Sequence, residues 1–103
     1  MIHALIADDH TIVREGLKQI LSETTDITVA DVASTGQEVI EKVRANSYDV
    51  VLLDISMPGK TGLEVLKQIK TEHPDVPVLI LTMYPEAQYA IRALKAGASG
   101  YLI

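Results

Sequence analysis

The chain contains no cysteine in its 103 residues. A disulfide framework and a metal site built from thiolates are therefore both excluded. Disulfides are typical of secreted proteins and rare in cytosolic ones. The absence of cysteine fits a cytoplasmic protein, and this is the location that we expect.

Long hydrophobic runs are also missing. A membrane-spanning helix needs about 20 consecutive apolar residues, and no run in this sequence approaches that length. The first nine residues include two aspartates and lack the basic region that begins a secretory signal. We therefore expect neither membrane insertion nor secretion. Hydrophobic residues still make up 48% of the chain, which is enough to build the core of one domain.

Positive charge is scarce as well. The sequence has 9 lysine and arginine residues against 14 aspartate and glutamate residues, and its net charge is −5. Proteins that bind DNA or RNA directly neutralise phosphates with a basic patch, and the sequence shows none. We expect no direct contact with nucleic acid, so control of a nucleic acid would need another domain.

Apolar segments alternate with helical patterns along the chain. Nearly continuous valine, leucine and isoleucine at residues 50–54 and 78–82 is typical of strands buried on both faces. Further strands are predicted at residues 4–7, 27–33 and 100–103. This order predicts an α/β fold with a parallel sheet. Right-handed crossovers would give a doubly wound, five-stranded, flavodoxin-like sheet with strand order 2-1-3-4-5.

The helices between these strands are predicted from apolar periodicity. Their inner faces are expected to contain, in chain order, Val13, Leu17, Ile20 and Leu21; Val39, Ile40 and Val43; Leu63, Leu66 and Ile69; and Ala87, Ala90, Ile91 and Leu94. Two capping boxes, Thr35 with Glu38 and Thr61 with Glu64, indicate where the second and third helices begin. Gly97 is predicted to end the fourth helix.

Three aspartates lie where predicted strands end. Asp8 and Asp9 follow the strand at residues 4–7, and Asp54 ends the strand at residues 50–54. The carboxyl ends of parallel strands line one crevice, where ligands bind. Carboxylates that come close there repel each other, and a bound divalent cation removes that cost. The sequence therefore predicts a magnesium site that also offers a carboxylate as phosphoryl acceptor.

Magnesium takes six oxygen ligands and usually keeps several waters. Asp9 and Asp54 are expected to be direct ligands, and Asp8 is expected to act through water. The backbone carbonyl of Ser56, just beyond Asp54, is the expected third direct ligand.

Other side chains near this edge have open roles. Thr82, after the fourth strand, is either a β-branched residue that closes the strand or a hydroxyl that can hydrogen-bond a phosphoryl oxygen on Asp54. Tyr101 is either a core or edge aromatic, or a side chain that moves between exposed and buried rotamers with Thr82. His10 is expected to be a solvated residue at a helix start, with contact to the acidic pocket as the alternative.

These residues occur in the order found in a known family. The chain resembles the receiver domain of two-component response regulators in Asp8-Asp9, Asp54-Ile55-Ser56-Met57-Pro58-Gly59, Thr82 and Gly100-Tyr101. The resemblance covers the whole chain. The stretches 8–17 and 81–84 are similar to the NarL/LuxR type, in which a receiver is joined to a C-terminal helix-turn-helix domain.

The resemblance implies a phosphorylation-controlled signalling switch, not an enzyme with its own substrate. It implies Asp54 as the phosphoacceptor, Asp8 and Asp9 as the metal-binding pair, Thr82 as the switch hydroxyl and Tyr101 as the switch aromatic. The implied cofactor is Mg²⁺, and the protein would assist its own phosphorylation and dephosphorylation. The implied partners are a sensor histidine kinase and a DNA-binding output domain that regulates transcription.

The chain departs from the family at its end. The family places a lysine after the fifth strand, followed by a fifth helix, whereas this sequence stops at Ile103. We interpret residues 1–103 as a receiver domain truncated at its C-terminus, without the fifth helix. Apolar side chains of the first helix, such as Val13 or Leu17, would then be uncovered and would favour self-association, for example as a homodimer.

Two other functions compete with this interpretation. A metal-dependent phosphohydrolase that forms an aspartyl-phosphate often has an Asp-x-Asp pattern after its first strand. Here Asp8 and Asp9 are adjacent and point differently, and the chain lacks a cap domain for a substrate. A phosphorylation-independent interaction domain would not need the acidic set. The intact set therefore favours the signalling switch.

Overall fold

The computed structural model describes residues 2–8, 10–23, 26–54, 62–81 and 87–102. Within these residues strands and helices alternate as β1 (Ile2–Ala7), α1 (Thr11–Ser22), β2 (Ile27–Ala33), α2 (Gly36–Ala45), β3 (Val50–Asp54), α3 (Gly62–Glu72), β4 (Val78–Leu81), α4 (Ala87–Lys95) and β5 (Gly100–Leu102). The strands form one parallel sheet in the order β2-β1-β3-β4-β5. The predicted flavodoxin-like α/β fold and its strand order are confirmed.

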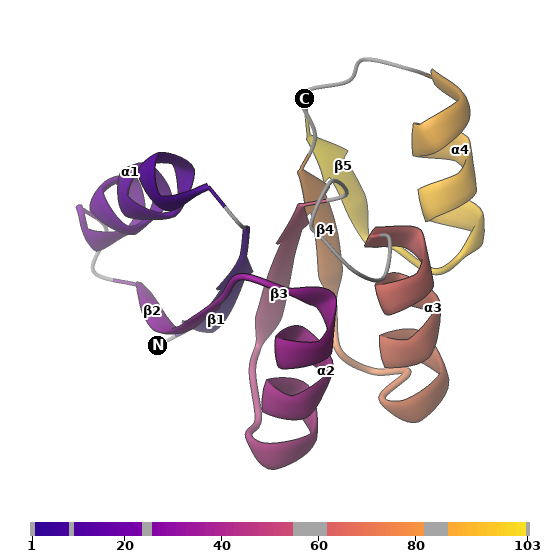
Figure 1. Ribbon diagram of the computed structural model, residues 1–103, viewed down its shortest axis with the longest axis horizontal. Helices are drawn as coiled ribbons and strands as arrows, with labels where there is room; N and C mark the ends of the chain where they lie inside the picture. The colour runs from indigo at the N-terminus through magenta and orange to yellow at the C-terminus, as the bar shows by residue number, and fades with distance from the viewer. Residues whose placement is uncertain (1, 9, 24–25, 55–61, 82–86, 103) are drawn as a thin grey trace.

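The helices cover the two faces of the sheet unequally. Figure 1 shows α1 on one side of the sheet and α2, α3 and α4 on the other. Because successive strand residues point to opposite faces, every second apolar residue of β1, β3 and β4 points toward α2 and α3. The fully buried side chains of this cluster include Leu5, Leu53, Ile80, Val39 and Leu66. The expected inner faces of α2 and α3 are therefore confirmed, with Leu63 half-buried at the rim of the core.

The expected inner face of α4 is wrong in its two large residues. Ile91 and Leu94 are 52% and 53% exposed, whereas Ala93 is buried in the core. The orientation that buries the small Ala93 turns the two larger side chains toward solvent.

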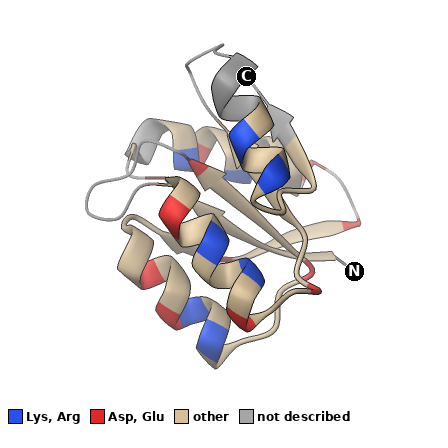
Figure 2. Cartoon of the chain, turned by 90° about the vertical axis from the view of Figure 1, so that its right-hand side faces the viewer, with Lys and Arg blue, Asp and Glu red and all other residues tan. Residues whose placement is uncertain are grey.

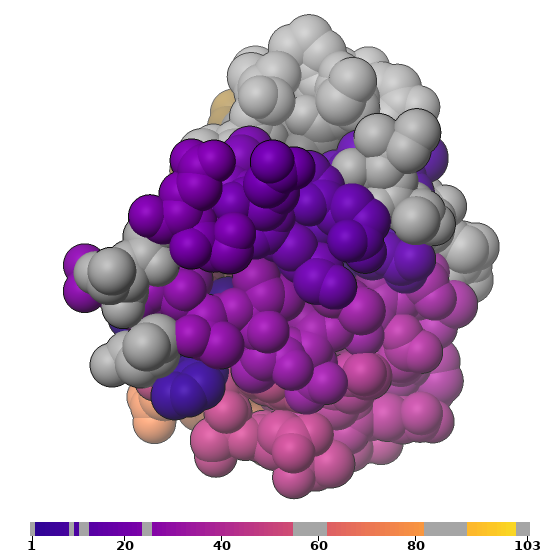
Figure 3. Space-filling view, turned by 90° about the vertical axis from the view of Figure 1, so that its left-hand side faces the viewer, coloured from indigo at the N-terminus to yellow at the C-terminus, as the bar shows by residue number. Residues whose placement is uncertain are grey.

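The expected inner face of α1 is only half correct. Leu17 and Leu21 are half-buried, but Ile20 is 62% exposed and Val13 is also exposed. Figure 3 looks onto this side of the molecule, where the violet residues of α1 lie at the surface. Among the described elements α1 is the only helix on its face, and it contacts chiefly β2. One helix at the edge of a sheet cannot bury its whole apolar stripe.

The capping box predicted at the start of α2 and the glycine stop predicted at the end of α4 are both present. The hydroxyl of Thr35 accepts a hydrogen bond from the backbone N–H of Glu38, and the Glu38 carboxylate accepts one from the N–H of Ser34. Gly97 has a φ of 107°, and it and Ala98 donate backbone hydrogen bonds to the last turn of α4. This pattern is the Schellman stop that glycine favours. The predicted cap at Thr61 lies outside the described residues.

Gly97→Ala is expected to lower the free energy of unfolding by about 1–2 kcal/mol, because a side chain disfavours this left-handed conformation. A Cβ atom there would also lie 3.0 Å from Lys70 Cγ. The matched control is Gly16→Ala in α1, where a Cβ atom meets nothing within 4 Å. Removing a helical glycine there should stabilise the chain by about 0.5–1 kcal/mol. Urea denaturation measures the free energy of unfolding of both variants. If both variants lost stability by the same amount, the assigned role of Gly97 would be contradicted.

A two-bond ion pair joins α2 to α3. Arg44 Nε and Nη2 donate to the two carboxylate oxygens of Glu72 at 2.7 and 2.8 Å. Figure 2 shows that charges of both signs lie along the outer surfaces of these two helices. The hydrogen bond from Arg44, with a further one from Gln68, lowers the pKa of Glu72 from 4.5 to about 2.

This pair predicts a pH dependence. Because folding lowers the pKa of Glu72, its stabilising effect is present above pH 4.5 and is lost as the pH falls toward 2. Glu72→Gln should therefore lower the urea midpoint at neutral pH, and the two midpoints should converge as the pH approaches 2. If the difference between the two urea midpoints stayed constant throughout this pH range, the stabilising role of the Glu72 charge would be contradicted.

Candidate functional site

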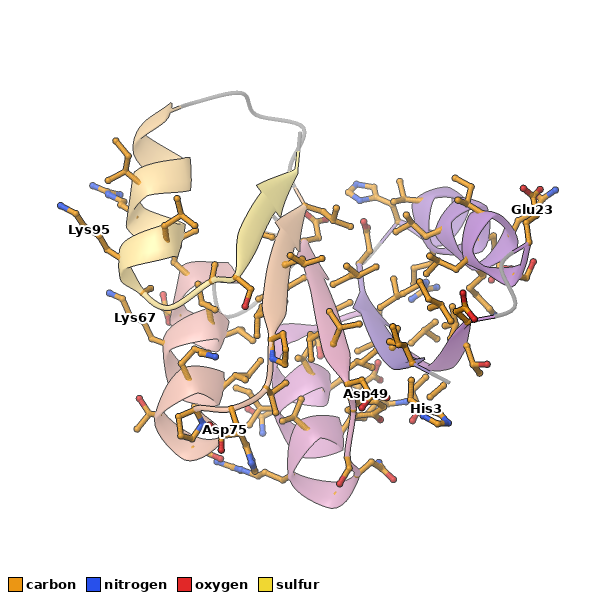
Figure 4. All side chains as sticks on the ribbon, turned by 180° about the vertical axis from the view of Figure 1, so that it is seen from behind. His3, Glu23, Asp49, Lys67, Asp75 and Lys95 are labelled. Atoms are coloured by element: carbon orange, nitrogen blue, oxygen red, sulfur yellow. The ribbon has the colours of Figure 1, made fainter. Side chains whose placement is uncertain are left out.

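The site is positioned by the pairing of β1 with β3. Ala7 pairs with Leu53, so Asp8 and Asp54 lie next to each other at the carboxyl edge of the sheet. At the opposite end Asp49 ties the start of β3 to β1, because its carboxylate accepts from the N–H of His3 at 2.7 Å (Figure 4). The backbone N–H of Asp49 in turn donates to the carbonyl of His3. This contact and the strand pairing hold the two carboxylates in register.

Both carboxylates are buried although they are charged groups. Asp8 is 3% exposed and Asp54 is 7% exposed. The backbone N–H of Asp8 donates to the carbonyl of Ala33, which fixes its position against β2. Buried carboxylates are costly unless they are paired, hydrogen-bonded or bound to a metal.

His10 lies beside this pair. Its backbone N–H donates to Asp8 Oδ1 at 2.8 Å, and its ring Nδ1 lies 3.0 Å from the same oxygen. The same Nδ1 is 3.7 Å from Asp54 Oδ2. One ligand atom from each of Asp8, His10 and Asp54 can be chosen so that all three lie within 4.8 Å of one another. The donor set is rich in carboxylate oxygens, which suits a small hard cation.

The comparison with known families decides the class of protein. Residues 4–103 match the model of the response regulator receiver domain. The chain belongs to this family. The response regulator UvrY from Escherichia coli O6:H1 is 42% identical to the receiver over 102 residues, which cover 99% of this chain and 47% of that protein.

Solved structures agree with this assignment. A LuxR-family two-component response regulator from Aurantimonas matches the receiver with a TM-score of 0.94 and 32% identity, over 98% of this chain and 72% of that chain. Response regulator TrrA from Thermotoga maritima, solved in complex with Mg(2+)-BeF, gives a TM-score of 0.89 and 34% identity, over 100% of this chain and 86% of that chain. The predicted NarL/LuxR type is confirmed. The receiver spans about half the length of the curated relatives that it matches.

The receiver brings together two of the predicted site residues, Asp8 and Asp54. Asp9, Ser56 and Thr82 lie outside the described residues, so their roles stay predictions. Tyr101 pairs with Ile80 in the sheet, and its side chain is outside the described part of the structure. Leu81, the residue before Thr82, pairs with Asp54 across β3 and β4.

His10 is the site residue whose contact the sequence argument did not favour. Its side chain is 61% exposed, as expected for a solvated helix start, yet its ring reaches Asp8. The signal that could have revealed the contact is local. An aspartate often accepts a hydrogen bond from the backbone N–H two residues later, and this bond brings the His10 backbone to Asp8.

Described helices of the receiver are all too short or too polar to cross a bilayer. The structure thus offers no candidate membrane span within its described ranges.

Proposed function

We propose that Asp54 is the phosphoacceptor of this receiver domain and that a sensor histidine kinase is the donor. The observation that carries the proposal is the pair of buried carboxylates, Asp8 and Asp54, at the carboxyl edge of the sheet. A chain of the receiver family with this pair is suited to a phosphorylation-controlled switch.

The transfer needs little covalent chemistry from the protein. A carboxylate oxygen of Asp54 attacks the phosphorus of a phosphohistidine, and the phosphorus–nitrogen bond breaks as the new oxygen–phosphorus bond forms. The electron pair of the broken bond leaves with the imidazole nitrogen of the kinase. The product is an acyl phosphate on Asp54. The protein contributes positioning and electrostatic stabilisation.

Mg²⁺ is the proposed cofactor. Asp9, Asp54 and the Ser56 carbonyl would hold the ion directly, and Asp8 would hold it through water. When bound, the ion neutralises charge on the phosphoryl oxygens during transfer. The oxygen donors of the described pair fit this ion, and the similar TrrA structure contains Mg(2+)-BeF.

Substitution of the acidic pair should weaken Mg²⁺ binding unequally. Asp9→Asn is expected to reduce the affinity more than Asp8→Asn, because Asp9 is the proposed direct ligand. Asp75→Asn, at an exposed position before β4, is the matched control and should leave the affinity unchanged. Isothermal titration of the three variants provides the measurement. Equal losses from Asp8→Asn and Asp9→Asn, or no loss from either, would contradict the ligand assignment.

The switch itself is proposed to act through Thr82 and Tyr101. The acyl phosphate would draw in the Thr82 hydroxyl, and Tyr101 would follow, which changes the surface of α4 and β5. This is a shift between two existing states that is driven by a local change of charge. The receiver would also assist its own dephosphorylation.

Residues 1–103 are proposed to be one domain of a longer cytoplasmic protein. The curated relatives are about twice as long as this chain, which leaves room for the C-terminal helix-turn-helix domain of the NarL/LuxR type. That domain would contact DNA, and the receiver would control it, with homodimerisation as one route.

Mass spectrometry after incubation with acetyl phosphate and Mg²⁺ tests the function. One added phosphoryl group is expected. The competing phosphohydrolase would instead release phosphate repeatedly from a monoester such as p-nitrophenyl phosphate. Steady turnover of that monoester without a labelled protein would favour the hydrolase.

A further inference from the structure

A positively charged groove lies between α3 and α4, apart from the acidic site. Its volume is about 330 Å³. The described residues that line it are Leu63 and Lys67 of α3, Arg92 and Lys95 of α4, and Ala96. Figure 4 shows Lys67 and Lys95 extending from neighbouring helices on the same side of the molecule, away from the sheet. None of these lining residues is acidic.

The three cations of the groove lack the hydrogen-bond or ion-pair partners that the other described lysine and arginine side chains have. Elsewhere Lys18 pairs with a glutamate, Lys42 with an aspartate and Arg44 with a glutamate. Lys70 donates to two backbone carbonyls, and Arg14 also has a partner. In the part of the chain that the structure describes, the lysine and arginine side chains without such a partner are Lys67, Arg92 and Lys95. An acidic chain of net charge −5 thus leaves these three described cations together in one groove.

The floor of the groove is apolar. Leu63 and Ala96 are half-buried and pack against the hydrophobic core. Leu63 belongs to α3 and Ala96 directly follows α4, so the floor has a fixed position. Apolar surface surrounded by cations is complementary to a ligand that presents an apolar side chain between carboxylates.

Charge also separates the classes of macromolecule that can bind here. A net charge of −5 repels a long polyanion such as DNA or RNA, because the negative charge of the protein acts on every phosphate within the Debye length. A short acidic segment needs only local complementarity. A symmetric contact between two copies that centres on this groove would place cations against cations. The charges therefore favour a partner protein.

We propose that the α3–α4 groove binds an acidic segment of a partner protein. An apolar side chain of that segment lies on Leu63 and Ala96, and its carboxylates pair with Lys67, Arg92 and Lys95. The proposal rests on side chains of α3, of α4 and of the residue after α4, and it uses none of the residues of the acidic site.

A synthetic peptide tests the proposal. The probe is the fluorescein-labelled, amidated peptide Glu-Asp-Leu-Glu-Asp, and the matched probe is Gln-Asn-Leu-Gln-Asn. Fluorescence anisotropy with the full chain should show saturable binding of the acidic peptide alone, and added salt should weaken it. Lys67→Glu and Arg92→Glu should each reduce the affinity by about fivefold or more, as expected for loss of an exposed ion pair and gain of a repulsion.

Lys18→Glu on α1 is the matched control, since it makes the same charge change away from the groove. It should leave peptide affinity within about twofold of the parent. Circular dichroism verifies the fold of each variant. If a charge-reversal variant does not fold, the neutral variant at the same position, Lys67→Gln or Arg92→Gln, is measured in its place. Three results would overturn the proposal: no saturable binding up to about 1 mM peptide, equal weakening by Lys18→Glu, or tighter binding of a DNA oligonucleotide than of the acidic peptide.

Discussion

Asp54→Ala should gain no phosphoryl group from acetyl phosphate and Mg²⁺, whereas the parent protein should gain one. The substitution removes the carboxylate oxygen that attacks phosphorus. Asp54 ends β3 and, together with Asp8, is one of the two buried carboxylates that the structure describes at the carboxyl edge of the sheet. The expected result is complete loss of labelling, measured by the mass of the intact protein.

Two controls separate chemistry from folding. Asp54→Asn keeps the size of the side chain and should also remain unlabelled. Asp75→Ala changes an exposed aspartate before β4 and should be labelled like the parent. The measurement should include any sequence that follows Ile103 in the natural protein, because the family resemblance places a phosphoryl-contacting lysine there. Single labelling that persists in Asp54→Ala would refute the assignment.

The strand order was predictable because it depends on features that the sequence carries directly. Continuous apolar runs indicate strands buried on both faces, and the handedness of crossovers restricts their order. The adjacency of Asp8 and Asp54 then follows, since Asp8 directly follows β1, Asp54 ends β3, and the two strands are neighbours. This part of the site needed no knowledge of side-chain packing.

The features that were not predictable depend on tertiary packing. In the folded chain α4 buries Ala93, whereas the sequence pattern favours the larger Ile91 and Leu94 as inner residues. The groove cations are equally hidden in the sequence. Lys67 and Arg92 line one groove only because α3 and α4 pack side by side.

Leu66→Ala should lower the free energy of unfolding by about 2–5 kcal/mol, because it leaves a cavity in the core. Leu66 is fully buried at the centre of α3, among residues of the core cluster. Total stabilities of small domains are about 5–15 kcal/mol. The substitution should therefore remove a large fraction of the stability and bring the variant close to unfolding.

The matched control is Leu94→Ala on α4, which makes the same chemical change at a side chain that is 53% exposed. This substitution should lower the free energy of unfolding by less than about 1 kcal/mol, because much of the Leu94 side chain already contacts water and alanine favours a helix slightly more than leucine. Urea denaturation of both variants gives the two values. The apolar pattern of the sequence places Leu66 and Leu94 alike on inner faces, so it predicts similar losses. The observed burial predicts a difference of severalfold, and similar losses would mean that Leu94 packs against the core after all.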